Sequence, residues 1–405
     1  MDEILPALRR DLEFFPVQNE GKQFILIRDP LGLVQEGRAV AVPLYQFMIL
    51  LDGRRTIRDI QIEMIRQQGG ILIGIDDLKG LFNHLDESFL VDSDRFKKAR
   101  DGIVQDFCSA QVRPCSHCGR AYPADPALLG RRLDEILAAE ESGPVNRGKP
   151  AGLVAPHIDF NVGFRVYSRA YQTLRDAAPS RVVILGVGHR MGEDLFSLTE
   201  KDFETPLGVA RTDRSLVQRL RKAGGDAIAP DDFVHRTEHS IEFQVVFLQH
   251  ILGEGAFTII PVLCGFFQVC LREYSREAYL ESAGPFLDEL RRILAEGDEE
   301  TLLVAGVDFS HIGPKFGHDE TARQLERQAA LHDRALLECL SRRDSLHFWE
   351  ESRRVEDRFN VCGFSALACL LEVLPRAEGH VLDYQTWHEE PTRSAVSFAA
   401  MSFTH

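Results

Sequence analysis

Three apolar runs of about five to seven residues constrain the fold of this chain more than any other feature. They cover residues 151–155, 182–187 and 302–307 and consist mainly of Val, Ile, Leu and Ala. Runs of this kind are typical of strands buried on both faces of a sheet. Segments with the apolar spacing of helices alternate with them, at residues 128–142, 168–178, 214–224, 238–252, 277–297, 320–340 and 366–377. This alternation predicts an α/β fold with a mostly parallel or mixed sheet flanked by helices.

Polar residues stand where these runs end. His157 follows the first run, His189 the second, and Asp308 and His311 the third. A less regular fourth segment brings Cys362 to the start of an apolar helix, whose N-terminus is expected to lower the pKa of the thiol. Because ligands bind beyond the carboxyl ends of strands in open α/β sheets, these side chains are expected to converge. Their groups suit metal ligation or acid–base catalysis, although each residue taken singly is also typical of a structural position.

A predicted helix that begins near residue 238 carries three further polar groups. Glu238 and Glu242 are four residues apart, and His239 and Glu242 are three apart, so they share a face. Glu238 is a helix-terminal acid favoured by the dipole in one interpretation. In the other interpretation, His239 carries a proton and the Glu242 carboxylate orients the imidazole of His239. The segment lacks the second histidine of the H-E-x-x-H motif, which argues against a zinc protease.

Composition and motifs exclude several classes of function. The net charge of −15 argues against a nucleic-acid-binding surface and against binding to an anionic membrane. No apolar stretch of about 18 residues predicts a membrane span, and residues 1–17 do not resemble a secretion signal. There is no Walker loop, G-x-S-x-G elbow or Rossmann fingerprint. The eight cysteines are spread through the chain, which favours a reduced, cytoplasmic setting over a disulfide framework.

Residues 1–95 are expected to form a small α+β domain of their own. Two short strands, at residues 24–32 and 38–43, are followed by three helices, the second of which Thr56 can cap. The order of elements and the sequence LDGRRTIRDI resemble the PqqD-like winged-helix family over residues 12–93. The resemblance implies binding of a peptide or a partner enzyme. A winged domain used for dimerisation is the alternative, and the low clustering of positive charge disfavours DNA binding.

Residues 96–118 are predicted to connect this domain to the α/β domain at residues 119–405. The connector ends in a C-x-x-C pair, Cys115 and Cys118, with His117 between them. Incidental thiols are the favoured interpretation. The pair could also provide half of a zinc site completed by Cys108 or another chain, or a redox dithiol, which would need a strand-to-helix setting.

Eight blocks within residues 119–403 resemble, in order, the motifs of the Memo family. They read AYPADPALLGRRLDEIL, APHIDFNVGFRVYSRAY, RVVILGVGH, TPLGVARTD, TEHSIEFQVVFLQ, TIIPVLCG, GVDFSH and NVCGFSA. The resemblance implies an α/β fold similar to that of class III nonhaem extradiol dioxygenases. The metal ligands it implies are His157, His189 and Cys362. It adds to the same pocket Asp308, His311 and His239.

Two departures from the family motifs bear on the substrate more than on the metal. Arg190 replaces a second histidine after the GPSH block, and Val187-Gly188 replaces its Pro-Ser. Two imidazoles and a thiolate suit iron, copper or zinc. The extradiol relatives hold Fe(II) with two histidines and a carboxylate, so iron or copper is favoured over zinc here, with Cys362 softening the site.

Two functions are compatible with these residues. The first is a redox or oxygen-using nonhaem metalloenzyme, in which His311 or His239 moves protons and Asp308 orients an imidazole. Microbial members of this family are associated with a radical SAM protein and an AMMECR-type protein as component B of the AmmeMemoRadiSam system. The N-terminal domain would then dock such a partner or its peptide. The second function is a non-catalytic scaffold that binds a peptide or partner and retains the metal pocket.

Overall fold

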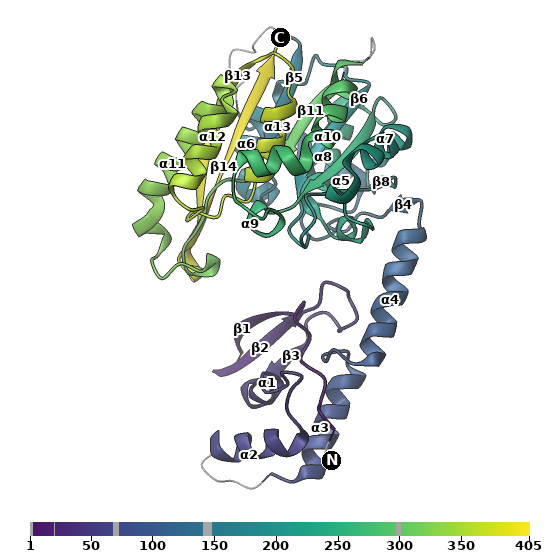
Figure 1. The fold of residues 1–405 in the computed structure, drawn as a ribbon, viewed down its shortest axis with the longest axis vertical. Helices are drawn as coiled ribbons and strands as arrows, with labels where there is room; N and C mark the ends of the chain where they lie inside the picture. Colours follow the sequence, from purple (N-terminus) through teal and green to yellow (C-terminus); the bar gives the residue numbers. More distant parts are fainter. Residues whose placement is uncertain (1–2, 20, 68–72, 141–147, 297–300) are drawn as a thin grey trace. The chain divides into compact units, whose positions relative to one another are not determined.

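The computed structural model describes residues 3–19, 21–67, 73–140, 148–296 and 301–405. The chain divides into two compact units, Met1–Ser109 and Ala110–His405, drawn as ribbons in Figure 1. Each unit has a hydrophobic core of its own.

The first unit combines a small antiparallel sheet with helices. Its strands pair in the order β1 (Glu13–Asn19), β2 (Lys22–Arg28), β3 (Ala39–Ala41). Its described helices are α1 (Val42–Met48), α2 (Ile57–Gln67), α3 (Ile75–Glu87) and α4 (Asp94–Ser109). Phe47, Ile60 and Leu85 of three helices are fully buried in one core with Ile27 of the sheet. The small α+β unit is confirmed, and its likeness to PqqD-like winged-helix domains stays a prediction.

Two local features show how the sequence sets this unit. Thr56 caps α2 as predicted: its Oγ1 accepts from the backbone N–H of Asp59 at 3.3 Å, and its own N–H donates to the Asp59 carboxylate at 2.8 Å. Strand β1 was not predicted, because it contains Pro16 and proline is unfavourable inside a strand. Proline is tolerated there because β1 is at the edge of the sheet.

The segment predicted as a connector, residues 96–118, is divided between the two units. Its first part belongs to α4, since Phe96 and Phe107 lie on one helical face and are both buried. Its last part belongs to the second unit, where Val112–Arg113 forms strand β4.

A mixed sheet forms the centre of the second unit. Among the described residues it has 11 strands, nine of them in the order β12-β14-β5-β11-β6-β10-β9-β8-β4, while β13 pairs with β14 and β7 with β10. The predicted runs become β5 (Pro150–Ala155), β6 (Arg181–Val187) and β11 (Thr301–Gly306). The others are β7 (Phe196–Leu198), β8 (Asp202–Thr205), β9 (Gly208–Thr212), β10 (Thr258–Cys264), β12 (His311–Ile312), β13 (Glu378–Glu389) and β14 (Ser394–Thr404). Neighbours within β5-β11-β6-β10 are parallel, and β14 is antiparallel to β5.

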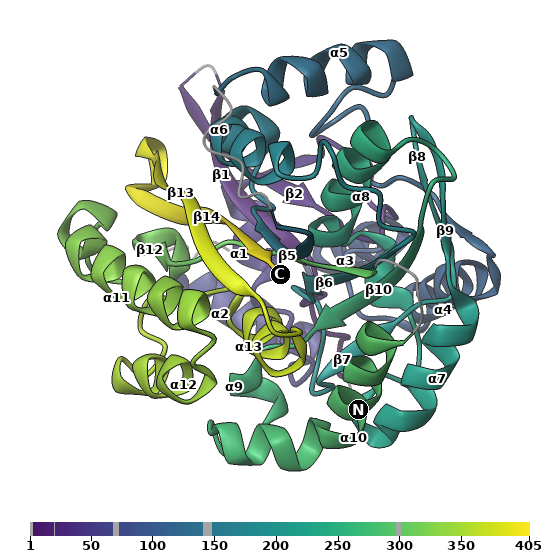
Figure 2. The same ribbon diagram turned by 90° about the horizontal axis from the view of Figure 1, so that it is seen from above.

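Helices cover both faces of this sheet (Figure 2). One face packs on α6 (Phe160–Gln172) and α8 (His239–Leu252), and α5 (Pro126–Leu137) packs against these two helices. The other packs on α7 (Arg214–Gly224), α10 (Arg276–Ala295) and α13 (Phe364–Val373). Alternate strand residues enter the two cores, as when Ile184 of β6 faces α8 while Leu185 faces the α13 side. The predicted α/β fold with a mixed sheet is therefore confirmed.

The remaining described α-helices are α9 (Phe267–Cys270), α11 (Ala322–Arg342) and α12 (Ser345–Arg354). Residues 68–69, 141–142 and 297, at the ends of three predicted helices, lie outside the described residues. No described helix combines the length and the apolar composition that crossing a bilayer would take.

Candidate metal centre

Three neighbouring strands end at the same edge of the sheet and bring their polar residues together. His157 follows β5, Asp308 follows β11 and His189 follows β6, and these strands are parallel neighbours in the order β5-β11-β6. Cys362 reaches the same point from the turn before α13, where the Gly363 N–H donates to the carbonyl of Asp308 at 3.1 Å. A Cβ on Gly363 would lie 2.5 Å from the Val307 Cβ, so glycine is required for this close approach.

His157, His189 and Cys362 form a compact set of donors. One potential ligand atom from each lies within 4.8 Å of the other two. The Cys362 Sγ is 3.5 Å from His157 Nε2, and the two imidazole centroids are 5.0 Å apart. The His157 side chain is 3% exposed, whereas that of His189 is 31% exposed. The set is therefore closed by protein on one side and accessible on the other, which suits a site with an open coordination position.

Each imidazole is oriented through its Nδ1 atom. His157 Nδ1 lies 3.0 Å from the carbonyl oxygen of Gly306, and His189 Nδ1 lies 3.0 and 3.1 Å from the Glu238 carboxylate oxygens. Because a carbonyl or carboxylate only accepts, Nδ1 carries the proton in both rings and the Nε2 lone pair is left for a ligand. This second contact is the one that metal-binding histidines usually make.

Glu238 both caps helix α8 and binds His189. As the N-cap of α8 it accepts the backbone N–H groups of His239 at 2.8 Å and Ser240 at 3.0 Å. It also accepts the backbone N–H of His189 at 3.2 Å. Burial opposes its ionisation, but His189 and the other donors hold the pKa of the Glu238 carboxyl well below its usual range. The acid at the start of the helix thus fixes a predicted ligand.

Burial sets the protonation of the metal-free cluster. It lowers the pKa of His157 well below its usual value, with smaller contributions from His239 and His189. It raises the pKa of the Asp308 carboxyl to about 7. It also raises the pKa of the Cys362 thiol far above its usual value, so the expectation that the helix N-terminus would lower that pKa was wrong. Burial beside the Asp308 carboxyl outweighs the helix dipole.

The residues predicted to move protons lie at different distances from the donors. Asp308 is adjacent: its Oδ2 is 3.6 Å from His157 Nε2, and its Oδ1 accepts the His157 N–H at 3.1 Å. The His239 ring stacks on His189 with centroids 5.0 Å apart, and it is 5.0 Å from His157. His311 bonds instead to the Phe309 carbonyl, its ring packs on Phe316, and burial lowers its pKa to about 4.

Glu242 is bonded to a neighbouring loop rather than to His239. The carboxylate accepts the backbone N–H groups of Ser116 at 3.0 Å and His117 at 2.9 Å, and the Tyr122 hydroxyl at 2.5 Å. Arg113 pairs with it at 2.6 Å, and both side chains are fully buried. The interpretation of Glu242 as the carboxylate that orients His239 is therefore not what the contacts show. Sequence reasoning missed these partners because they lie more than 100 positions away from Glu242.

The two cysteines of this loop are joined. Cys115 and Cys118 form a disulfide, and both are partly exposed. The favoured prediction of incidental linker thiols was wrong, since the loop is folded into the second unit and its cysteines are bonded to each other. The other cysteines in the described residues form no disulfide.

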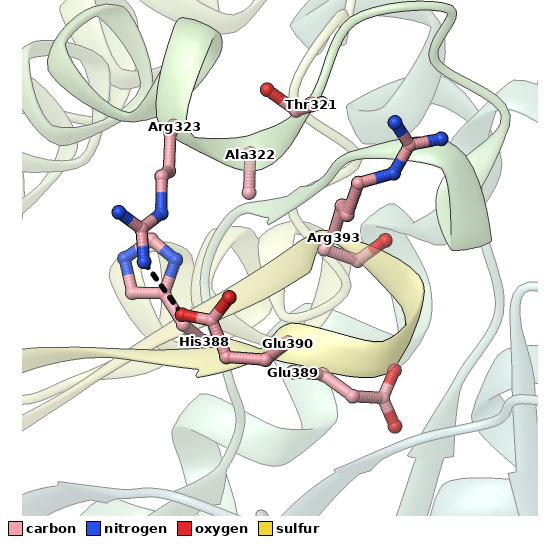
Figure 3. Close-up of a pocket in the computed structure, with 8 residues that line it drawn as sticks. Thr321, Ala322, Arg323, His388, Glu389, Glu390 and Arg393 are labelled. Atoms are coloured by element: carbon pink, nitrogen blue, oxygen red, sulfur yellow. Dashed lines mark hydrogen bonds and ion pairs between the residues drawn. The ribbon is translucent and has the colours of Figure 1, made fainter.

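A separate pocket lies between the start of α11 and the β13–β14 hairpin (Figure 3). It is lined in part by Arg323, Glu390 and Arg393, and Arg323 is ion-paired with Glu390 at 2.7 Å. None of the predicted site residues lines this pocket.

Comparison with known proteins gives consistent matches. The model of a family described as "Memo-like protein" matches residues 113–402. A MEMO1 family protein of Aquifex aeolicus is 30% identical over 404 residues, which cover 98% of this chain and 100% of that protein. One from Methanopyrus kandleri is 31% identical over 284 residues, covering 66% of this chain and 89% of the relative. One from Thermus thermophilus is 27% identical over 356 residues, covering 84% and 97%.

These matches also locate the two units. The Aquifex match covers the residues of both units. The family match begins at Arg113 and therefore includes the Cys115–Cys118 loop.

Proposed function

Because the chain belongs to the Memo family, we propose that its second unit binds one transition-metal ion through His157, His189 and Cys362. The observation that carries the proposal is the orientation of the two imidazoles. Both Nδ1 atoms are engaged by oxygen acceptors, which leaves both Nε2 lone pairs for a ligand. One potential ligand atom of each histidine and the Cys362 thiol lie within 4.8 Å of one another. Two nitrogens and a sulfur suit iron, copper or zinc.

The residues around the donors support a redox or oxygen-using enzyme. A bound iron or copper ion would supply electron transfer and an open coordination position. Asp308, whose pKa is raised to about 7, can hold or release a proton at Oδ2 beside His157. His239 offers a second imidazole on the accessible side, next to His189. A non-catalytic scaffold would not need titratable groups at this position.

Metal analysis tests the binding proposal. Purified protein is loaded separately with Fe(II), copper or Zn²⁺, desalted and analysed by elemental mass spectrometry. We expect about one ion per chain for the wild type and a loss of more than tenfold in affinity for His157→Ala and Cys362→Ala. Cys339→Ala and His250→Ala, outside the donor set, are matched controls and should load like the wild type. Equal loading of all five proteins would overturn the proposal.

Oxygen consumption separates the two functions. The iron- or copper-loaded protein is screened with catechol-like substrates, with Asp308→Asn as a variant that keeps the three donors. Turnover that falls in Asp308→Asn supports the enzyme. Absence of turnover together with tight peptide binding supports the scaffold.

We also propose that the protein acts with a radical SAM partner docked on the first unit. The support is the family association and the match of the Aquifex relative over the residues of both units. Co-purification of a radical SAM protein encoded in the same genome with the full chain, and its loss when residues 1–109 are removed, is the expected result. Equal recovery with and without these residues would contradict it.

A further inference from the structure

The Cys115–Cys118 loop is part of the Memo-like region, but the proposed metal site does not use its disulfide. The bond encloses only Ser116 and His117. A loop this short gains about 2 kcal/mol from being closed, less than half of the gain for a disulfide that closes a loop of about 100 residues. The stability gained by closing the loop is therefore smaller than for most structural disulfides.

The loop is held in place without the disulfide. Ser116 donates to Glu242 through its backbone N–H at 3.0 Å and through its hydroxyl at 2.8 Å, and the His117 N–H donates at 2.9 Å. The Arg113 guanidinium, just before the loop, bonds Glu242 and the backbone carbonyls of His235 and Glu238. These bonds would keep the two thiols close after reduction, so that re-forming the disulfide stays an intramolecular step.

The loop also adjoins the metal pocket. The His117 ring centroid is 5.6 Å from that of His239, which stacks on His189. Glu242, the anchor of the loop, lies one helical turn after Glu238, the residue that orients His189. A change in the position of the His117 ring therefore reaches the pocket through the contact with His239.

From these observations we propose that Cys115–Cys118 is a thiol–disulfide exchange site for an external dithiol, and that its redox state changes the pocket through the ring of His117, which contacts His239. The two sulfurs are partly exposed, which allows a reductant to approach. The pair follows strand β4 without a helix directly after it, since α5 begins only at Pro126. Exchange therefore relies on exposure and on the fixed loop, not on a helix dipole.

The step is balanced by the dithiol itself. A thiolate of the reductant attacks one sulfur, the Cys115–Cys118 bond breaks, and a mixed disulfide forms with release of the other cysteine thiolate. The second thiol of the reductant then displaces the bound cysteine. The reductant leaves as a disulfide, and the chain gains two electrons and two protons as two thiols.

The exchange is tested on the full-length, metal-free chain. The protein is equilibrated in mixtures of reduced and oxidised dithiothreitol, trapped with an alkylating reagent, and the labelled cysteines are counted by mass spectrometry. We expect one reversible two-thiol transition at Cys115 and Cys118. It should be absent in Cys115→Ser and in Cys118→Ser and unchanged in Cys108→Ser, whose cysteine is exposed and outside the disulfide. No reversible transition in the wild type would overturn the proposal. So would tight binding of Zn²⁺ by the reduced pair, because the site would then be a metal site.

The coupling to the pocket is tested by the reactivity of the histidines. The rate of carbethoxylation of His189 and His239 is measured in the oxidised and the reduced metal-free protein. We expect rates that differ severalfold between the two states of the wild type and are the same under both conditions in Cys115→Ser. Equal rates in both states of the wild type would overturn the coupling. Because no metal is present, this result does not depend on whether the proposed metal site is correct.

Discussion

Replacing Glu242 with Gln should strongly destabilise the second unit. Glu242 and Arg113 are both fully buried and are 2.6 Å apart. The substitution leaves the Arg113 charge buried without its partner, which costs about 3–5 kcal/mol. A glutamine also offers only one acceptor oxygen, whereas the native carboxylate uses both, Oε2 for Ser116 and Oε1 for His117. We therefore expect a loss of about 3–5 kcal/mol in the free energy of unfolding.

The assay is urea denaturation followed by tryptophan fluorescence. Trp349 and Trp387 are the only tryptophans of the chain and both belong to the second unit, so the signal reports that unit alone. Glu296→Gln is the matched control, because Glu296 pairs with Arg219 at 2.7 Å with both side chains at least 40% exposed. Such a solvent-exposed pair contributes little to stability, because water screens it. A loss for Glu242→Gln no larger than that of Glu296→Gln would refute the reasoning.

Three further predictions follow from the protonation states and the buried ion pair of the first unit. Since burial keeps the Cys362 thiol protonated, metal binding must release its proton, and the affinity for Zn²⁺ should rise about tenfold per pH unit between pH 6 and 8. Competition with a chelator measures this affinity. The dependence of the affinity on pH should be weaker in Cys362→Ala. The raised pKa of Asp308 means that the folded metal-free protein keeps a proton that the unfolded chain loses between pH 4 and pH 7. Asp308 therefore lowers the free energy of unfolding as the pH rises through this range, by about 4 kcal/mol in total. Urea denaturation should show a smaller fall with pH in Asp308→Asn, and an equal fall in both proteins would contradict this. In the first unit, the side chains of Asp29 and Arg9 are both fully buried, whereas that of Asp11, which pairs with the same arginine, is 40% exposed. Hydrogen exchange should show that the free energy of unfolding of this unit falls by about 3–5 kcal/mol in Asp29→Asn and by less than about 1 kcal/mol in Asp11→Asn. The tryptophan transition of the second unit should be unchanged in both variants.

The strand-end part of the site could be predicted because its signals are local. A run of buried apolar residues identifies a strand, and parallel strands bring their carboxyl ends to one edge, which places His157, His189 and Asp308 together. The α/β class and most helices follow from the same periodicities. The sequence pattern of His239 and Glu242 was correctly assigned to one helix, α8.

What could not be predicted depends on contacts between distant segments. Arg113 and Glu242 carry no mark of their pairing, and the tautomer of His189 depends on a carboxylate 49 positions away. The pKa of Cys362 depends on burial beside Asp308, which competes with the local effect of the helix. Strands β13 and β14 escaped prediction because residues 378–389 are only partly buried and 394–404 contain several serines, which hide the apolar pattern.

The position of β14 has a consequence for how the protein is made. All of its residues are buried, and it pairs with β5, with β12 and with β13, so it fills the middle of one half of the sheet. The ribosome produces β5 first and β14 only after the rest of the unit. At about 5–20 residues per second, the residues between them take roughly 12–50 s to synthesise. Throughout that time the edge of β5 that pairs with β14 in the folded protein exposes unpaired backbone groups, and such an edge can pair with other chains. The unpaired edge of β5 therefore has to be kept apart from other nascent chains until β14 has been synthesised and can pair with it.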